Sequence, residues 1–213
     1  MNDPAPGMLL IDGEDVRGYS LQQLRSQVAL IPQDPFLFSL TIRDNLTYDD
    51  PERDMPPIEH AAQLAELLDA IDEFPDGMET IVGERGITLS GGQKQRATLA
   101  RGLIRDARIL AMDDCFSSVD TRTEERILGR LKEVRHGLTT LLVSHRVSTA
   151  RHADRIFVME DGRILESGTH AELMAKGGYY ADLEAVQSNQ DQDRERKAAL
   201  LRNLDIDVRV VNG

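Results

Sequence analysis

The sequence has few of the features that secreted, membrane-spanning or nucleic-acid-binding proteins require. Its 213 residues include a single cysteine, Cys115, so an internal disulfide is excluded and a reducing compartment is favoured. No apolar run approaches the roughly 18–20 residues that cross a bilayer, and residues 1–6 lack the basic region and apolar core of a signal peptide. The net charge of −12 argues against a nucleic-acid surface, which needs clustered Lys and Arg.

The chain does contain an alternation of short apolar runs and amphipathic segments, which predicts an α/β fold. Its length suffices for one domain with a sizeable core, or for one domain plus an appendage. Strands are expected at residues 8–11, 27–31, 109–112 and 139–143, and a hairpin at residues 155–166. The runs at 109–112 and 139–143 are apolar enough to predict strands buried in a parallel sheet.

Several helices are predicted from their capping residues and apolar spacing. Capping boxes are expected to open helices after Ser20 and Thr169. One amphipathic helix is expected over Ile58–Phe74, after a linker at Pro51–Pro57, and its inward side chains are Ala61, Leu64, Leu68 and Ile71. Another begins at Asp120 or Thr121 with a capping box at Thr121 and Glu124, and its buried face is Ile127, Leu128, Leu131 and Val134.

The stretch Leu89–Gln93 combines a helix start with two glycines. Ser90 is expected to cap the helix, while Gly91 and Gly92 allow backbone to approach another group closely. Because a helix start has N–H groups without partners and the positive end of the helix dipole, it favours an anion such as phosphate. The alternative is a turn that simply ends in a cap.

A strand-end carboxylate follows about twenty residues later. The apolar run Ile109–Met112 delivers Asp113 to the carboxyl end of its strand, the edge at which ligands collect in open α/β sheets. A carboxylate there can hold Mg²⁺, usually through water, while the metal bridges nucleotide phosphates. The alternative is a capping or turn aspartate.

Together these motifs resemble the nucleotide-binding domain of ABC transporters over roughly residues 8–187. Asp113 matches the Walker B aspartate, Gln33 the Q-loop glutamine and His145 the switch histidine, and Thr80–Gly86 is similar to the X-loop of exporters. The signature motif is matched by Leu89, Ser90, Gly91, Gly92 and Gln93, and the D-loop by Ser117, Ser118, Val119 and Asp120.

The resemblance implies a P-loop NTPase-like ABC cassette, truncated at its N-terminus, with a helical subdomain inserted in a mainly parallel sheet core. The expected divisions are the start of the ATP-binding core at 1–35, the helical subdomain with the signature at 36–104, the rest of the core at 105–187, and a charged, flexible tail at 188–213. The surface around Phe36–Phe38 and Tyr48 would face the membrane part, although Phe36–Phe38 could equally be core.

The resemblance also implies cofactors and roles for single residues. ATP and Mg²⁺ are the expected cofactors, with Asp113 and Gln33 facing the metal. Gln33 would sense the metal and the attacking water, and His145 would contact the γ-phosphate. Asp114 stands where the family has its catalytic glutamate, and its shorter side chain is expected to make a poor base.

A Gly-rich P-loop ending in Gly-Lys-Ser or Gly-Lys-Thr does not occur in the sequence. The chain is therefore expected to start just after that loop, either as a fragment of a longer transporter half or as a truncated gene product. By itself it is expected to bind ATP weakly and to be inactive, with some strand edges and core-facing side chains uncovered.

The intact signature beside a weak base resembles one member of a heterodimeric exporter. The expected partners are a second ABC cassette that carries the catalytic glutamate and the transmembrane domain of an exporter, with no nucleic acid. This places the chain at the cytoplasmic face of the membrane through a partner or a transmembrane domain. Two alternatives stay open: a soluble ABC ATPase not linked to transport, and a non-catalytic remnant that packs against another cassette.

Overall fold

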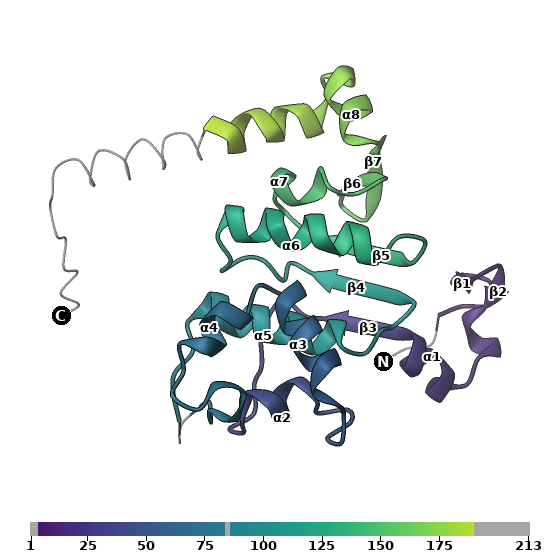
Figure 1. Cartoon of the computed structure of the whole chain (residues 1–213). Helices are drawn as coiled ribbons and strands as arrows, with labels where there is room; N and C mark the ends of the chain where they lie inside the picture. Colours follow the sequence, from purple (N-terminus) through teal and green to yellow (C-terminus); the bar gives the residue numbers. More distant parts are fainter. Residues whose placement is uncertain (1–3, 84–85, 190–213) are drawn as a thin grey trace, which may run out of the picture. The chain divides into compact units, whose positions relative to one another are not determined.

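The computed structural model describes residues 4–83 and 86–189 (Figure 1). They fall into two compact units whose border lies between Val143 and Ser144, and each unit is described by itself. No helix among the described residues is long and apolar enough to span a membrane. The predicted divisions at residues 1–35, 36–104 and 105–187 remain predictions.

The first unit opens with a small hairpin and a capped helix. Strands β1 (Leu10–Ile11) and β2 (Glu14–Asp15) pair antiparallel around Asp12 and Gly13, which both adopt positive φ angles. A 3-10 turn, η1 (Val16–Gly18), leads to α1 (Leu21–Gln27). The predicted capping box of α1 is confirmed, because Ser20 and Gln23 exchange side chain to backbone hydrogen bonds.

A three-stranded parallel sheet forms the centre of this unit, in the order β3 (Val28–Ile31), β4 (Ile109–Asp113), β5 (Thr139–Val143). Ile31 and Met112 are register partners on its buried face. Leu30 and Leu141 lie on the other face and are 63% and 57% exposed. The prediction that 139–143 is a buried strand is therefore wrong, since β5 pairs with β4 alone among the described strands and most of its side chains are exposed.

The helical part of the unit departs from the predicted single helix over Ile58–Phe74. It forms two helices, α3 (Met55–Leu64) and α4 (Leu68–Asp72), separated at Glu66, whose φ is 55°. Arg126 and Arg130 hold the Glu66 carboxylate at 2.9 and 2.5 Å, which fixes this break. The linker predicted at Pro51–Pro57 is also too long, because two prolines lie in the first turn of α3, where proline is tolerated.

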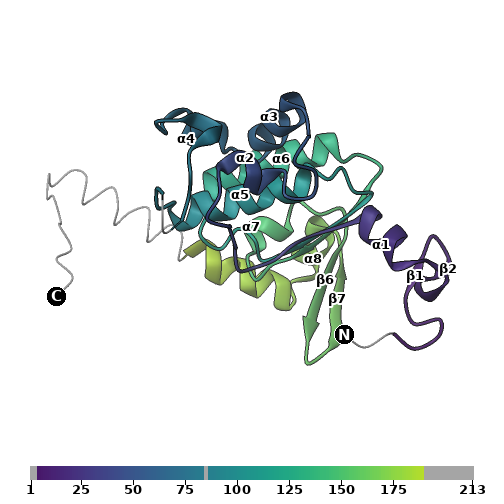
Figure 2. The ribbon, with the colours of Figure 1, turned by 90° about the horizontal axis from the view of Figure 1, so that it is seen from below.

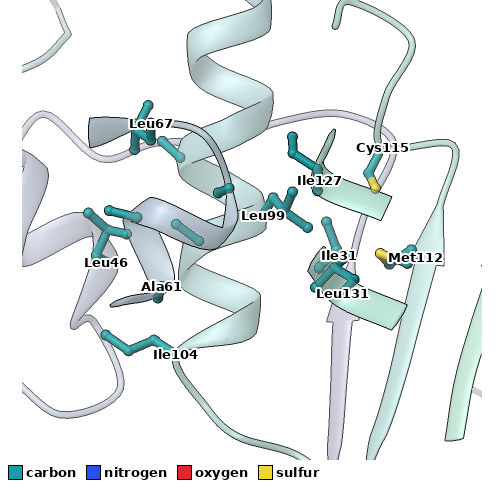
Figure 3. Packing of buried hydrophobic residues seen from close by; sticks show 14 of the residues in the cluster. Ile31, Leu46, Ala61, Leu67, Leu99, Ile104, Met112, Cys115, Ile127 and Leu131 are labelled. Atoms are coloured by element: carbon teal, nitrogen blue, oxygen red, sulfur yellow. The ribbon is translucent and has the colours of Figure 1, made fainter. Parts of the chain in front are cut away.

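The first unit also contains two short elements and two longer helices. Helix α2 (Ile42–Leu46) begins after its N-cap Thr41, and a 3-10 turn, η2 (Gly77–Glu79), follows α4. Helices α5 (Gly91–Leu103) and α6 (Thr121–Val134) pack on the buried sheet face, where Leu99 and Ile127 meet the strand side chains (Figure 3).

Two details of α6 differ from the prediction. Asp120 alone caps the helix by accepting a hydrogen bond from the Thr123 N–H at 3.0 Å, so the structure has no capping box at Thr121 and Glu124. Val134, expected inward, is 47% exposed because it lies in the last turn, beyond the sheet contact made by Leu131.

The second unit is built on a hairpin. Strands β6 (Ile156–Glu160) and β7 (Arg163–Gly168) lie side by side, as predicted, and turn at Asp161 and Gly162 (Figure 2). Helix α7 (Val147–Ala150) precedes them, and α8 (His170–Lys176) follows with the predicted capping box at Thr169. Residues 179–189 are helical; the rest of the predicted tail, 190–213, lies outside the described residues.

Candidate functional site

The start of α5 has the helix cap that the sequence predicts at Ser90. Ser90 Oγ accepts a hydrogen bond from the Gln93 N–H at 3.2 Å, and Gln93 Oε1 accepts one from the Ser90 N–H at 2.8 Å. The N–H groups of Gly91 and Gly92 have no partner within the helix. Leu89, which precedes the cap, is buried and anchors the turn, while Ser90 is exposed.

The segment Ser117–Asp120, predicted to be the D-loop, lies against this helix start. A Cβ atom placed on Gly92 would lie 2.8 Å from the Ser118 carbonyl oxygen, and one on Gly91 would lie 3.3 Å from the Ser118 Cβ. Glycine is therefore required at position 92, because the obstacle is backbone. A cavity of about 420 Å³ opens between the two segments, lined by Ser90, Gly91, Gly92, Arg96, Ser118, Val119 and Asp120.

Two glutamines that the sequence did not single out hold predicted loops in place. Gln95 in α5 contacts Ser117 and Ser118 through both atoms of its side-chain amide. Gln187, in the helical stretch 179–189, accepts a hydrogen bond from the Val147 N–H and donates one to the His145 carbonyl oxygen, both at 2.8 Å. No local pattern singles out Gln95, because its partners lie 22 and 23 residues away in the sequence.

At the end of β4 the chain turns sharply and brings two predicted residues together. Asp114 adopts a φ of 41°, and its N–H donates to the Val143 carbonyl oxygen at 2.9 Å. Gln33, just beyond β3, donates from Nε2 to Asp114 Oδ2 at 3.3 Å. Parallel strands end at the same edge of a sheet, which explains why residues 81 positions apart meet here.

The same edge carries carboxylate and amide oxygens, the kind of ligand atom that Mg²⁺ binds. Asp113 is exposed, and Gln33 uses its amide nitrogen, not its oxygen, in the hydrogen bond to Asp114. The described residues contain no cluster of three or more His, Cys, Asp or Glu that could enclose an ion. This donor set fits a metal held by one or two carboxylates, water and substrate phosphates rather than by a protein cage.

Two further residues lie near the ends of strands: Cys115, which is not a predicted site residue, and His145, the predicted switch histidine. Burial raises the pKa of the Cys115 thiol to about 12, so it serves as a small core residue and not as a nucleophile. His145 belongs to the second unit, and its expected contact with the γ-phosphate remains a prediction. Glu84 and Arg85 of the predicted X-loop lie outside the described residues.

Exposed aromatic rings lie side by side in the helical part of the first unit. Phe38 stacks on Tyr48 with ring centroids 4.6 Å apart, and Phe36 meets Phe38 edge to face at 4.9 Å. Phe36 and Tyr48 are 61% and 60% exposed, so these two are not core residues.

Comparison with known proteins decides the family. The model of the ABC transporter family matches residues 1–117, more than half of the chain. The chain belongs to the ABC transporter family. It is 47% identical over 184 residues to an uncharacterized ABC transporter ATP-binding protein, YknU, of Bacillus subtilis (strain 168), which covers 86% of this chain and 32% of that protein.

Further relatives indicate the exporter type. An ATP-dependent lipid A-core flippase of Burkholderia pseudomallei (strain 1710b) is 44% identical over 190 residues, covering 89% of this chain and 32% of the flippase. The structure of a bacterial Atm1-family ABC exporter with ATP bound superposes with a TM-score of 0.78 at 40% identity, covering 84% of this chain and 31% of that one. The chain is an α/β ABC cassette of the exporter type, and it spans about a third of the length of these relatives.

Proposed function

We propose that the chain is the ATP-binding part of an ABC exporter and that it acts on two different nucleotides. Its signature, Leu89–Gln93, closes over ATP held by a second cassette. The carboxylates after β4 serve a nucleotide bound on the chain's own side. The observation that supports this most directly is the start of α5, where glycine N–H groups border a polar cavity suited to a phosphate.

The carboxylates have unequal roles in this proposal. Asp113 and Gln33 would hold Mg²⁺, which would supply charge to polarise the phosphates, and Gln33 would orient the attacking water. Asp114 stands in the position of the base, but it is one methylene shorter than glutamate and its carboxylate already accepts a hydrogen bond from Gln33. Hydrolysis on this side is therefore slow, and the partner that carries a glutamate performs most of it.

Docking to a membrane part is proposed for the exposed rings of Phe36 and Tyr48. Stacked aromatic side chains offer a large apolar contact area with little loss of side-chain entropy, which suits a binding surface. Two similar proteins are an exporter and a flippase by name, so transport across a membrane, at its cytoplasmic face, is the proposed role of the assembly.

Two substitutions in the assembled transporter test the asymmetry. Ser90→Arg places a bulky cation at the mouth of the cavity, and we expect ATP turnover to fall at least about a hundredfold, as when a transition-state donor is lost. Asp114→Asn should leave more than about half of the turnover, because little hydrolysis depends on this base. Steady-state phosphate release measures both.

Ser26→Arg is the matched control for the new side chain. Ser26 is an exposed serine in α1, away from the cavity lining, and its substitution should leave turnover unchanged. Equal losses in Ser90→Arg and Asp114→Asn would refute the asymmetry. An unchanged rate in Ser90→Arg would refute the role of the signature.

A further inference from the structure

Gln95 joins the signature helix to the D-loop through a buried pair of hydrogen bonds. Its side chain is 3% exposed. Its Nε2 donates to Ser117 Oγ at 2.6 Å, and its Oε1 accepts from the Ser118 N–H at 2.7 Å. Both partners are more than twenty residues away in the sequence, and strand β4 lies between them and Gln95 along the chain.

The site requires a side-chain amide. One atom of Gln95 donates and the other accepts, so both polar atoms of the buried group are satisfied. An apolar side chain of the same length would fill the space but would leave the Ser118 N–H without its partner. Gly92, one turn earlier on the same helix, lies so close to the Ser118 carbonyl oxygen that a Cβ atom there would clash with it, so α5 contacts Ser118 at two points.

The D-loop is also fixed at its start and at its end. Cys115 and Phe116, which connect Asp113 and Asp114 to Ser117, are 2% and 3% exposed. Asp120 ends the segment by capping α6. Between these anchors Ser117 and Ser118 are exposed residues whose described hydrogen bonds go to Gln95.

We infer that Gln95 is a positioning residue that makes the signature helix and the D-loop move as one body. This inference rests on the proposed function, in which the signature serves the partner's nucleotide and Asp113 and Asp114 serve the other. Gln95 touches neither nucleotide. It transmits the closing of one site to the segment that begins three residues after Asp114, at the other site.

Hydrogen exchange of single amides tests the link in the chain itself. Gln95→Met keeps the length and removes both hydrogen bonds, so the Ser118 amide should exchange about five- to tenfold faster, while the Leu99 amide in the middle of α5 keeps its rate. Gln22→Met, the same substitution at an exposed position of α1, should change neither rate. An unchanged Ser118 rate in Gln95→Met overturns the inference.

A milder variant covers the case in which Gln95→Met fails to fold. Ser117→Ala removes only the hydroxyl bond on the exposed side, and it should accelerate Ser118 exchange by less than the loss of both bonds. A Ser118 rate equal to that of the unsubstituted chain in this folded variant contradicts the link as well.

Measuring ATP turnover in the assembled transporter distinguishes a positioning role of Gln95 from a role in stability alone. Gln95→Met should lower kcat between about tenfold and a hundredfold and change the KM for ATP less than about twofold, because the nucleotide contacts are intact while the loop is displaced. If Ser90→Arg abolishes turnover and Gln95→Met leaves kcat unchanged, the inference fails and the proposed function stands. If Ser90→Arg has no effect, the proposed function fails, and the exchange data still decide whether Gln95 holds the loop.

Discussion

At the scale of single residues, Asp120 is both the last residue of the proposed D-loop and the N-cap of α6. Its carboxylate accepts the Thr123 N–H at 3.0 Å, and this hydrogen bond holds the pKa of Asp120 below its usual value. A carboxylate whose pKa is lowered by folding stabilises the fold above the unfolded-state pKa, near 3.9, and loses this contribution as the pH falls through the folded-state value.

Substitution of Asp120 should therefore have a pH-dependent effect on stability. Asp120→Ala is expected to lower the free energy of unfolding by about 1 kcal/mol near neutral pH, because the cap is lost. Asp120→Asn keeps an acceptor oxygen but has no carboxylate to protonate. The free energy of unfolding of this variant should therefore not show the decrease below about pH 4 that protonation of Asp120 causes in the unsubstituted chain. Urea unfolding at several pH values measures this; parallel pH profiles of the Asn variant and the unsubstituted chain would contradict the assignment.

The same scale shows which contacts a sequence can predict. The capping boxes predicted at Ser20 and Thr169 and the N-cap predicted at Ser90 all join residues three apart, and all three caps are confirmed. Gln95 and Gln187 were missed because their partners lie 22 or more residues away and become neighbours only after the chain has folded.

At the scale of elements, the packing of α5 on β3 depends on one glycine. A Cβ atom on Gly102 would lie 2.5 Å from Ile31 Cγ1, well inside van der Waals contact. Gly129 in α6 has no such neighbour within 4 Å. At Gly102 the close packing therefore outweighs the higher helix propensity of alanine. At Gly129 no such contact opposes the gain in helix propensity.

Alanine at the two positions should have opposite effects. Gly102→Ala is expected to destabilise the fold by about 1–3 kcal/mol, because the buried Ile31 must shift. Gly129→Ala should stabilise it by up to about 1 kcal/mol, the difference in helix propensity. Thermal unfolding followed by circular dichroism reports both, and a higher midpoint for Gly102→Ala would show that the contact is not tight.

Elements whose ends depend on distant residues were predicted least well. The apolar spacing from Ile58 onward continues through residue 71, so the sequence predicts one helix. The break at Glu66 is held by Arg126 and Arg130, which are sixty or more residues away. No local sequence pattern therefore predicts it. The parallel strand Ile109–Asp113, in contrast, is apolar within itself and was predicted correctly.

At the scale of the whole molecule, the order of the strands explains why the candidate site could be predicted in part. Parallel strands β3 and β4 deliver Gln33 and Asp114 to one edge, which their positions after apolar runs already indicated. The signature lies at the start of a separate helix, α5, beside the D-loop. We propose that Ser90 and Asp113 serve two different nucleotides, so that a single chain carries one half of each site.

The structure of the assembled transporter with Mg-ATP bound tests this claim most directly. It should place the γ-phosphate of the ATP held by the second cassette about 2.7–3.2 Å from the Ser90 hydroxyl and the Gly92 nitrogen. Asp113 should face the metal of the other nucleotide. A structure in which Ser90 and Asp113 contact the same nucleotide, or in which the start of α5 contacts none, would contradict the account.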